Sequence, residues 1–237
     1  MTEPTSPELS IVVLAYNEAE NVGRVLDELY AWPWEHTFEV ILIDDGSSDG
    51  TRNVAQQHLR PTDKTIRHEH NRGMGAGLKT GAAAAQGRWL TFIPADGQIP
   101  PRGIATLARA GDEDVDLVLS VYEDRNDGAT RTALSWGVRA LIEMVHGVRL
   151  RSDGPYLVRR RLFDPAQLQA DTFFLNFELP IRAAAAGLRT RTVSMRCRPR
   201  MSGKSKTARP GRALRVAGEL LAFRGRRLAD AMRRAVG

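Results

Sequence analysis

Three short polar segments hold the side chains of this 237-residue chain that are best suited to chemistry. Each segment follows an apolar run, and together they carry Glu18, the adjacent Asp44 and Asp45, and Asp96 with Gln98. The oxygen ligands of the third segment, Asp96 and Gln98, could hold Mg²⁺ or Mn²⁺ beside a diphosphate. Glu18 is equally suited to capping a helix or to accepting hydrogen bonds from a nucleotide base. Each segment alone is compatible with ordinary turn chemistry, but three in this order favour a ligand site.

The elements around these segments alternate between strand and helix. Apolar runs bounded by turn residues predict strands at residues 9–15, 38–43, 64–70, 89–93 and 116–122. Helices are predicted over residues 18–30, 49–59 (with Asp49 as a candidate cap) and 75–86, and after the proline pair at 100–101. This alternation predicts an α/β fold with a right-handed, mostly parallel, Rossmann-like sheet. Ligands of such sheets bind beyond the carboxyl ends of the strands, where the polar segments would lie.

The second half of the chain has a looser pattern. It predicts helices over residues 131–145, 174–186 and 213–236, a strand at 155–161, an edge strand at 189–198 and a basic loop at 201–210. We therefore expect a loose polar leader at 1–8, one α/β domain at 9–210 and a basic amphipathic helix at 211–237. We find no apolar run long enough to span a membrane and no signal peptide, and the single Cys197 suits a reducing cytosol.

The glycine-rich turn at residues 71–77 and the five histidines are weaker signals. The turn opens a helix, but it matches neither G-x-x-x-x-G-K-[ST] nor the dinucleotide-binding fingerprint. Phosphate contact and close backbone packing are both compatible with it. The histidines lack the spacing of a zinc site, so we interpret them as structural or surface residues.

Charge is distributed unevenly along the chain. Residues 182–237 contain 16 Lys and Arg against two acidic residues, whereas the rest of the chain has 18 basic and 26 acidic residues. Such asymmetry favours an anionic partner, either lipid phosphate, a membrane surface or nucleic acid, over a merely solvated helix. We do not expect nucleic acid, because no aromatic platform accompanies the charge.

Taken together, the motifs resemble those of glycosyltransferase family 2, whose fold is called GT-A. Members of this family typically carry Tyr-Asn-Glu, Asp-Asp-Gly-Ser-x-Asp-Gly-Thr and Asn-x-Gly-x-Gly, which correspond here to residues 16–18, 44–51 and 71–75. Their metal motif is usually Asp-x-Asp-x-Gln followed by Pro-Pro, and residues 94–101 of this chain read Pro-Ala-Asp-Gly-Gln-Ile-Pro-Pro. The resemblance covers about residues 10–210, with Pro94 in place of the first aspartate.

Later segments resemble the polyprenyl-phosphate sugar transferases of the dolichyl-phosphate mannosyltransferase type. These enzymes carry an Asp before a Ser-Gly-Phe-Arg-like strand, where this chain has Asp153 followed by Gly-Pro-Tyr. They also carry Arg-x-x-Gly-x-Ser-Lys, which is present here at residues 200–206. The resemblance implies an inverting transfer of a hexose from a UDP- or GDP-sugar to a polyprenyl phosphate. It also implies a peripheral protein at the cytoplasmic face of the membrane.

The same resemblance implies roles for individual residues. Catalytic roles fall on Asp96, Asp153 and Arg200, and Asp96 with Gln98 would bind Mg²⁺ or Mn²⁺. The nucleotide would contact Ala15, Tyr16, Glu18, Asp44, Asp45, Asn71 and Gly73. The phosphates of donor and acceptor would contact Arg125, Arg131, Arg200, Ser202, Lys204 and Ser205.

Two alternatives stay open at this point. One is a family 2 enzyme with a saccharide or small-molecule acceptor, whose hydroxyl would need Asp153 or Glu178 as a base. The other is a catalytically degenerate scaffold subunit, which Pro94 favours. The sequence does not specify the oligomeric state.

Overall fold

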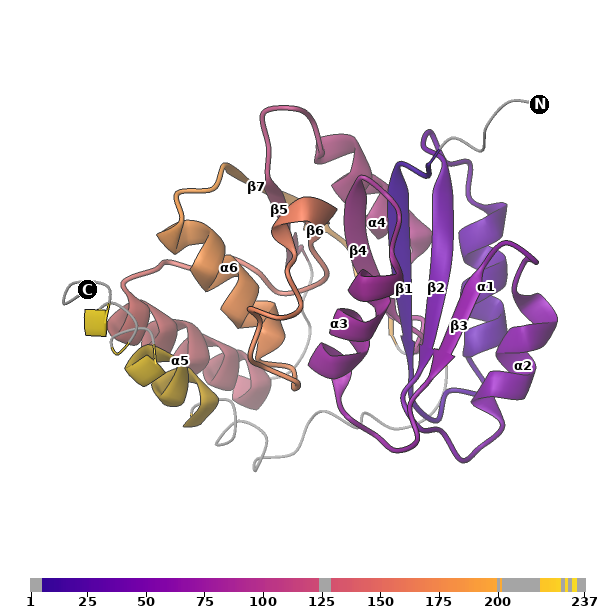
Figure 1. Cartoon of the computed structure of the whole chain (residues 1–237), viewed down its shortest axis with the longest axis horizontal. Coiled ribbons are helices and arrows are strands. Elements are labelled where there is room, and N and C mark those ends of the chain that lie inside the picture. Colours follow the sequence, from indigo (N-terminus) through magenta and orange to yellow (C-terminus); the bar gives the residue numbers. More distant parts are fainter. Residues whose placement is uncertain are drawn as a thin grey trace.

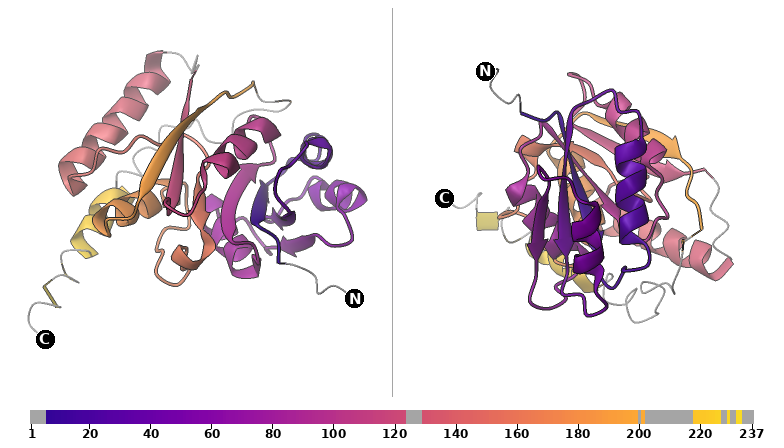
Figure 2. Two further views of the ribbon diagram at one scale, coloured as in Figure 1. Left: turned by 90° about the horizontal axis from the view of Figure 1, so that it is seen from above. Right: turned by 90° about the vertical axis from the view of Figure 1, so that its right-hand side faces the viewer.

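A seven-stranded sheet with helices on both faces forms the centre of the computed structural model (Figures 1 and 2). The structure describes residues 6–123, 129–199, 201, 218–226, 229 and 232–233, without the side chains of 129–136 and 138. The strands are β1 (Leu9–Ala15), β2 (Phe38–Asp44), β3 (Lys64–Arg67), β4 (Trp89–Pro94), β5 (Leu117–Tyr122), β6 (Leu157–Arg159) and β7 (Thr190–Met195). The helices are α1 (Val22–Ala31), α2 (Thr51–His58), α3 (Met74–Ala84), α4 (Pro101–Ala110), α5 (Ala129–His146) and α6 (Leu175–Ala185), and a 3₁₀ turn spans Arg160–Leu162.

Two apolar cores lie on the two faces of this sheet. Successive strand residues point to opposite faces, so Val40 and Leu42 join one core whereas Ile41 and Ile43 join the other. The first core contains residues of α1, α2 and α4, and the second contains residues of α3, α5 and α6. The central strands are therefore buried on both faces, as their continuous apolar sequence predicts.

The predicted mostly parallel sheet is confirmed, with one antiparallel strand whose position was not predicted. The strand order is β3-β2-β1-β4-β6-β5-β7, and only β6 runs antiparallel to its neighbours β4 and β5. The edge strand expected at residues 189–198 is β7. Most element ends differ from the prediction by one to three residues; the largest shift is at α1, which begins at Val22 rather than at residue 18, and β3 ends at Arg67 rather than at residue 70.

The parallel register brings the carboxyl ends of the central strands to one level. Ala15 pairs with Asp44, and Leu14 pairs with Pro94, so the loops after β1, β2 and β4 start side by side. The Ala95 N–H points toward β1 and bonds to Leu14 O. The nitrogen of the preceding Pro94, which carries no hydrogen, therefore faces β6. The β6 ladder has already ended at residue 91, so proline costs no strand hydrogen bond there.

A helical segment at residues 218–226 packs beside α5 and α6 at one end of the molecule (Figure 1). Leu220 and Phe223 are each 1% exposed, and the Phe223 ring lies 5.3 Å from that of His146 and 5.9 Å from that of Phe174. None of the described helices is long and apolar enough to cross a membrane. The inner side of this segment is thus part of the core.

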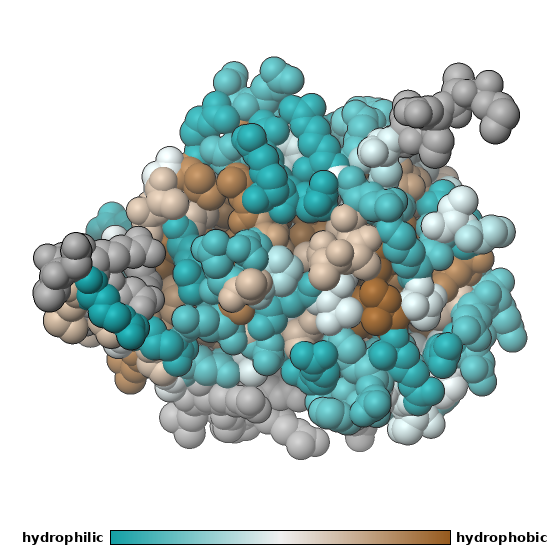
Figure 3. All heavy atoms as spheres, viewed as in Figure 1, coloured by the Kyte–Doolittle hydropathy of each residue, from teal (hydrophilic) through white to brown (hydrophobic). Residues whose placement is uncertain are grey.

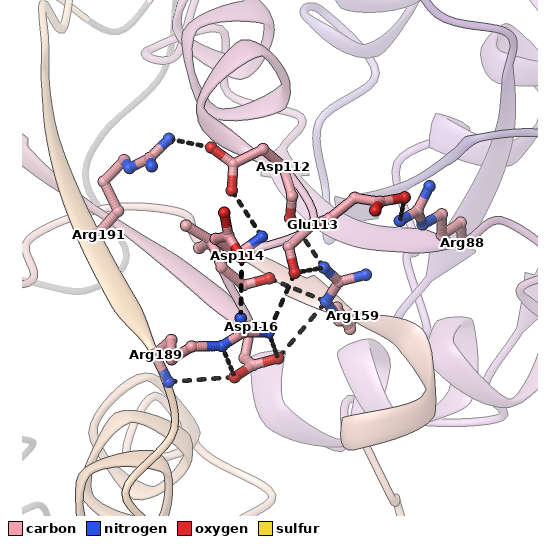
Figure 4. A network of polar contacts seen from close by, with 9 residues as sticks. Arg88, Asp112, Glu113, Asp114, Asp116, Arg159, Arg189 and Arg191 are labelled. Atoms are coloured by element: carbon pink, nitrogen blue, oxygen red, sulfur yellow. Dashed lines mark hydrogen bonds and ion pairs between the residues drawn. The ribbon is translucent and has the colours of Figure 1, made fainter.

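An ion-pair network ties the opposite, amino edge of the sheet together (Figure 4). Asp116 lies just before β5 and pairs with Arg189 at 3.2 Å and with Arg159 at 3.5 Å. Arg159, at the end of β6, also donates to backbone carbonyls of the α4–β5 loop and stacks over the Trp89 ring. Because β5, β6 and β7 are short, these contacts fix their relative positions at this edge.

We predict that Asp116→Asn lowers the melting temperature at pH 7 by about 2–4 °C, the size expected for weakening an ion pair whose arginine is half exposed and partly screened by solvent. The hydrogen bond from Arg189 holds the pKa of Asp116 below its ordinary value of 3.8, although burial opposes the shift. A depressed pKa in the folded state contributes stability above pH 4, and this contribution is lost as pH falls further. Thermal unfolding at pH 7 and pH 3 should therefore show a difference that shrinks at pH 3. Asp114→Asn, an exposed partner of the same arginine, is the control, and an equal effect of both variants would contradict the prediction.

Candidate functional site

The predicted site residues that the structure describes all lie on the carboxyl edge of the sheet. Along this edge the loop after β3 comes first, followed by the loops after β2, β1 and β4. Because β6 is antiparallel, the segment that leads into it, with Asp153, lies at the same edge next to β4. The chain that leaves β7 also emerges there. Segments far apart in the sequence therefore meet at one edge.

Hydrogen bonds lock the loop after β1 to the loop after β2. The Asn17 N–H donates to Ser47 Oγ at 2.9 Å, and Asn17 Oδ1 accepts the Ser48 N–H at 2.9 Å. Asn17 has φ +53°, a left-handed conformation that is uncommon for residues other than glycine. The neighbouring Tyr16 side chain is left 38% exposed at this edge. The two loops are therefore held as one unit.

Asp49 strengthens the same connection. Its carboxylate accepts the Ala19 N–H at 3.1 Å and the Thr51 N–H at 3.1 Å, while Thr51 Oγ1 accepts the Glu18 N–H at 2.8 Å. Burial raises the pKa of Asp49, but the bonds from Thr51 and Ala19 outweigh it and bring the pKa below its ordinary value. Gly50 occupies the N-cap position of α2. Asp49, the predicted cap, lies one residue before it and accepts the N–H of Thr51, the first residue of the helix.

Asp45 uses both carboxylate oxygens to hold the glycine-rich turn. Oδ1 pairs with His68 Nδ1 at 2.7 Å and accepts the Arg72 N–H at 2.9 Å, and Oδ2 accepts the Gly73 N–H at 2.9 Å. His68 is 6% exposed and reaches Thr80 Oγ1 on α3 with its other nitrogen, at 3.0 Å. This histidine is structural, as expected, and it orients a predicted nucleotide-binding residue.

Asp44 and Glu18 are also buried at this edge. Asp44 is fully buried; its Oδ1 accepts the Ser47 N–H at 2.9 Å, and its Oδ2 lies 3.6 Å from Arg67 Nε. Glu18 is 7% exposed, and its carboxylate accepts a hydrogen bond from the Asn21 amide at 2.7 Å. Both carboxylates are fixed in place by the protein.

Close packing accounts for the glycines of the turn before α3. Gly73 has φ +96°, and a Cβ there would lie 2.7 Å from Asp171 O. A Cβ on Gly75 would lie 2.6 Å from Thr172 O. The turn therefore packs against the backbone before α6, while Asn71 is exposed beside it.

Asp96 is fixed in a tight turn after β4. Asp96 is 7% exposed, its Oδ1 accepts the Gln98 N–H at 3.0 Å, and Gly97 has the left-handed φ of +74°. Among the described residues, no group of three or more His, Cys, Asp or Glu side chains could hold a metal ion unaided. Mg²⁺ commonly uses one or two protein carboxylates and completes its coordination with substrate phosphates and water. The single Asp96 carboxylate fits that mode and does not fit an all-protein cage.

Asp153 pairs with an arginine that the sequence did not indicate. Arg139 of α5 makes an ion pair with the Asp153 carboxylate, which is 11% exposed. The Asp153 N–H donates to Ser120 O at 2.8 Å and so anchors this segment to β5. The site thus includes a cation from α5 beside a predicted catalytic carboxylate.

Two other residues that the sequence analysis connects with the acceptor, Tyr156 and Glu178, are buried in the core. Tyr156, which stands where the family motif has Phe, is fully buried in the core, with its ring 5.1 Å from that of Phe92. Glu178 is also fully buried; it accepts the N–H groups of Gln169 and Ala170 and pairs with Arg182 at 2.8 Å. Glu178 is therefore a structural residue.

Several predicted residues lie outside the described part of the structure. These are Arg125, Arg200, Ser202, Lys204 and Ser205, and Arg131 belongs to α5 but its side chain is not described. Sequence reasoning missed Arg139, His68 as a partner of Asp45, and Arg198. No local pattern identifies them, since each acts through a residue far away in the sequence.

We predict that His68→Ala accelerates amide hydrogen exchange at Arg72 and Gly73, because Asp45 then loses the side chain that orients it. An effect of about tenfold corresponds to one buried hydrogen bond of about 1.4 kcal/mol. Exchange measured by NMR or mass spectrometry over residues 71–77 tests this. His70→Ala, an exposed histidine two residues away, is the control, and unchanged exchange in His68→Ala would refute the orienting role.

Comparison with known proteins agrees with this geometry. The chain is 31% identical over 156 residues to dodecaprenyl-phosphate galacturonate synthase of Rhizobium johnstonii, which covers 63% of this chain and 46% of the relative. It is 28% identical to undecaprenyl-phosphate 4-deoxy-4-formamido-L-arabinose transferase of Pseudomonas syringae, over 84% of this chain and 60% of the relative. The chain thus spans about half the length of these curated relatives.

Similarity to solved structures establishes the fold. Glucosyl-3-phosphoglycerate synthase from Mycobacterium tuberculosis, solved with Mn²⁺, UDP-glucose and phosphoglyceric acid, superimposes with a TM-score of 0.74 at 22% identity. The match covers 92% of this chain and 80% of that protein, which confirms the expected GT-A fold. The family model described as "Glycosyl transferase family 2" matches residues 10–179. The chain therefore belongs to glycosyltransferase family 2.

Proposed function

We propose that this protein transfers a hexose, with inversion, from a UDP- or GDP-sugar to a polyprenyl phosphate. The observation that carries the proposal is the arrangement of the carboxyl edge, where buried carboxylates after β1, β2 and β4 meet the chain that leads into the basic segment. The names of the two curated relatives, which specify dodecaprenyl and undecaprenyl phosphate, support the same acceptor class.

The donor would bind across the loops after β1, β2 and β4. Glu18 and Asp45 would hold the nucleoside, with Asp44 buried nearby, and Asp45 also fixes the turn at Arg72 and Gly73. Ala15, Tyr16 and Asn71 would complete that side. Asp96, with Gln98, would hold Mg²⁺ or Mn²⁺ at the diphosphate. When bound, the ion offsets the charge that develops on the leaving nucleoside diphosphate.

An anionic acceptor fits the basic groups at this edge better than a hydroxyl acceptor does. A sugar hydroxyl needs a general base, whereas a lipid phosphate is already a charged nucleophile that needs positioning. Glu178 is buried and engaged by backbone N–H groups, and Asp153 is paired with Arg139. Arginine binds phosphate in a bidentate manner, which suits the predicted Arg125, Arg131 and Arg200 to this task, with Ser202, Lys204 and Ser205 as further phosphate contacts.

A membrane surface is the proposed location of this chemistry. The helical segment at 218–226 buries Leu220 and Phe223 but leaves Leu221 56% exposed, and Met232 is 63% exposed. Met144 of α5 is 81% exposed, and small apolar patches appear among hydrophilic residues at that end of the molecule (Figure 3). Apolar side chains among arginines favour a peripheral helix at an anionic membrane, here its cytoplasmic face.

We predict that purified protein transfers radiolabelled sugar from one member of a panel of UDP- and GDP-sugars to polyprenyl phosphate with Mg²⁺ or Mn²⁺. The product should be extractable into butanol and labile to mild acid. Asp96→Ala should lower the rate by at least about 100-fold, the cost of removing several kcal/mol of transition-state stabilisation. Asp114→Asn, at the opposite edge, is the matched control for loss of a carboxylate.

Other outcomes of this assay distinguish the alternatives. Transfer to phosphoglyceric acid or to a saccharide, and not to the lipid, would identify a small-molecule acceptor. Nucleotide binding with no transfer to any acceptor would favour the scaffold role and would refute the proposed activity.

A further inference from the structure

The turn that carries Asp96 is held by the chain that leaves β7. The Met201 N–H donates to Asp96 O at 3.3 Å, and the Arg198 N–H donates to Gln98 O at 3.0 Å. The remaining carbonyl, Gly97 O, accepts a hydrogen bond from Arg198 Nε. All three backbone carbonyls of the turn are therefore bonded to Arg198 or to Met201.

Side-chain packing joins the same two segments. Gly97 has φ +74°, and a Cβ placed on it would lie 2.5 Å from Met201 Sδ. The Met201 side chain thus occupies the space that a larger residue at position 97 would need. The left-handed backbone conformation at position 97 favours glycine, and the Met201 side chain packs directly against it.

Glu28 of α1 orients the Arg198 guanidinium. The Glu28 carboxylate makes an ion pair with Arg198 Nη2, and Arg198 Nη1 lies 3.4 Å from Glu28 Oε1. Burial raises the pKa of Glu28, but the bonds and charges of Arg198 and then Arg24 outweigh it and bring the pKa below its ordinary value. Arg198 is 31% exposed and Glu28 is 26% exposed, so the pair is largely shielded from solvent. Arg198 therefore has one end fixed on α1 and the other on the turn.

We propose that Arg198, oriented by Glu28, is a positioning residue that sets the Asp96 turn for the divalent ion and the donor diphosphate. The inference rests on the proposed function. Arg198 touches neither the reacting atoms nor the Asp96 carboxylate, and it acts through Gly97 O and the backbone of the turn.

A lysine could not reproduce this geometry. Arginine donates from Nε to Gly97 O while its terminal nitrogens reach Glu28, and this requires the planar fork of the guanidinium. A lysine ammonium at the same position would serve one partner at a time. Arg198→Lys should therefore restore only part of the function lost in Arg198→Ala.

The test is calorimetric binding of UDP and GDP to the full chain over a range of Mn²⁺ concentrations. We expect Arg198→Ala to raise the Mn²⁺ concentration for half-maximal nucleotide binding about tenfold, as loss of a charge-assisted hydrogen bond would. Glu28→Gln should give a smaller rise, because Arg198 keeps its bond to Gly97 O. Arg196→Ala is the matched control: it removes an arginine two residues away that pairs with Glu123 at 2.8 Å.

The outcomes separate this inference from the proposed function. A merely structural role would lower the melting temperature of Arg198→Ala and leave the Mn²⁺ dependence of the folded protein unchanged, which would overturn the inference. If Arg198→Ala does not fold, Glu28→Gln decides, and an unchanged Mn²⁺ dependence there overturns it. A wild-type protein that binds neither UDP nor GDP at any Mn²⁺ concentration would overturn the proposed function together with this inference.

Discussion

The parallel register of β2, β1 and β4 is the constraint on which the rest of the structure depends. Because Ala15 is level with Asp44 and Leu14 with Pro94, three loops start at the same height on one edge. The strands are buried on both faces, so a shift of register would disturb both cores at once. This register sets the positions of the polar residues at the strand ends, and the burial of the apolar strand residues maintains the register.

Hydrogen bonds between neighbouring loops then fix the positions of the residues at the strand ends. Asn17 and Asp49 connect the loops after β1 and β2, and Asp45 connects the loop after β2 to the turn before α3. Arg198 does the same for the loop after β4. Each loop is therefore restrained by a neighbour, and the site is organised before any ligand binds. Such preorganisation is what electrostatic stabilisation of a leaving diphosphate requires.

The sequence predicts the sheet and the carboxylate segments because both depend on local patterns. Apolar runs mark β1, β2 and β4, and Asp44, Asp45 and Asp96 follow them directly. The strand at residues 155–161 was predicted and is β6, but its antiparallel insertion between β4 and β5 was not predictable in this way, since pairing order depends on tertiary contacts rather than on a local pattern. The partners of the site residues were missed for a related reason. Arg139 and Arg198 reach Asp153 and Gly97 through tertiary contacts that no spacing in the sequence encodes.

Anomalous scattering from crystals grown with UDP or GDP and Mn²⁺ is the most direct measurement of where the donor binds. We expect one Mn²⁺ peak within coordination distance of the Asp96 carboxylate, with the diphosphate completing its ligands and the nucleoside lying toward Glu18 and Asp45. Crystals of Asp96→Asn grown in the same way should lose the peak. A Mn²⁺ ion or a nucleotide bound away from the carboxyl edge, or a peak unchanged in Asp96→Asn, would contradict a donor site built on these strand ends.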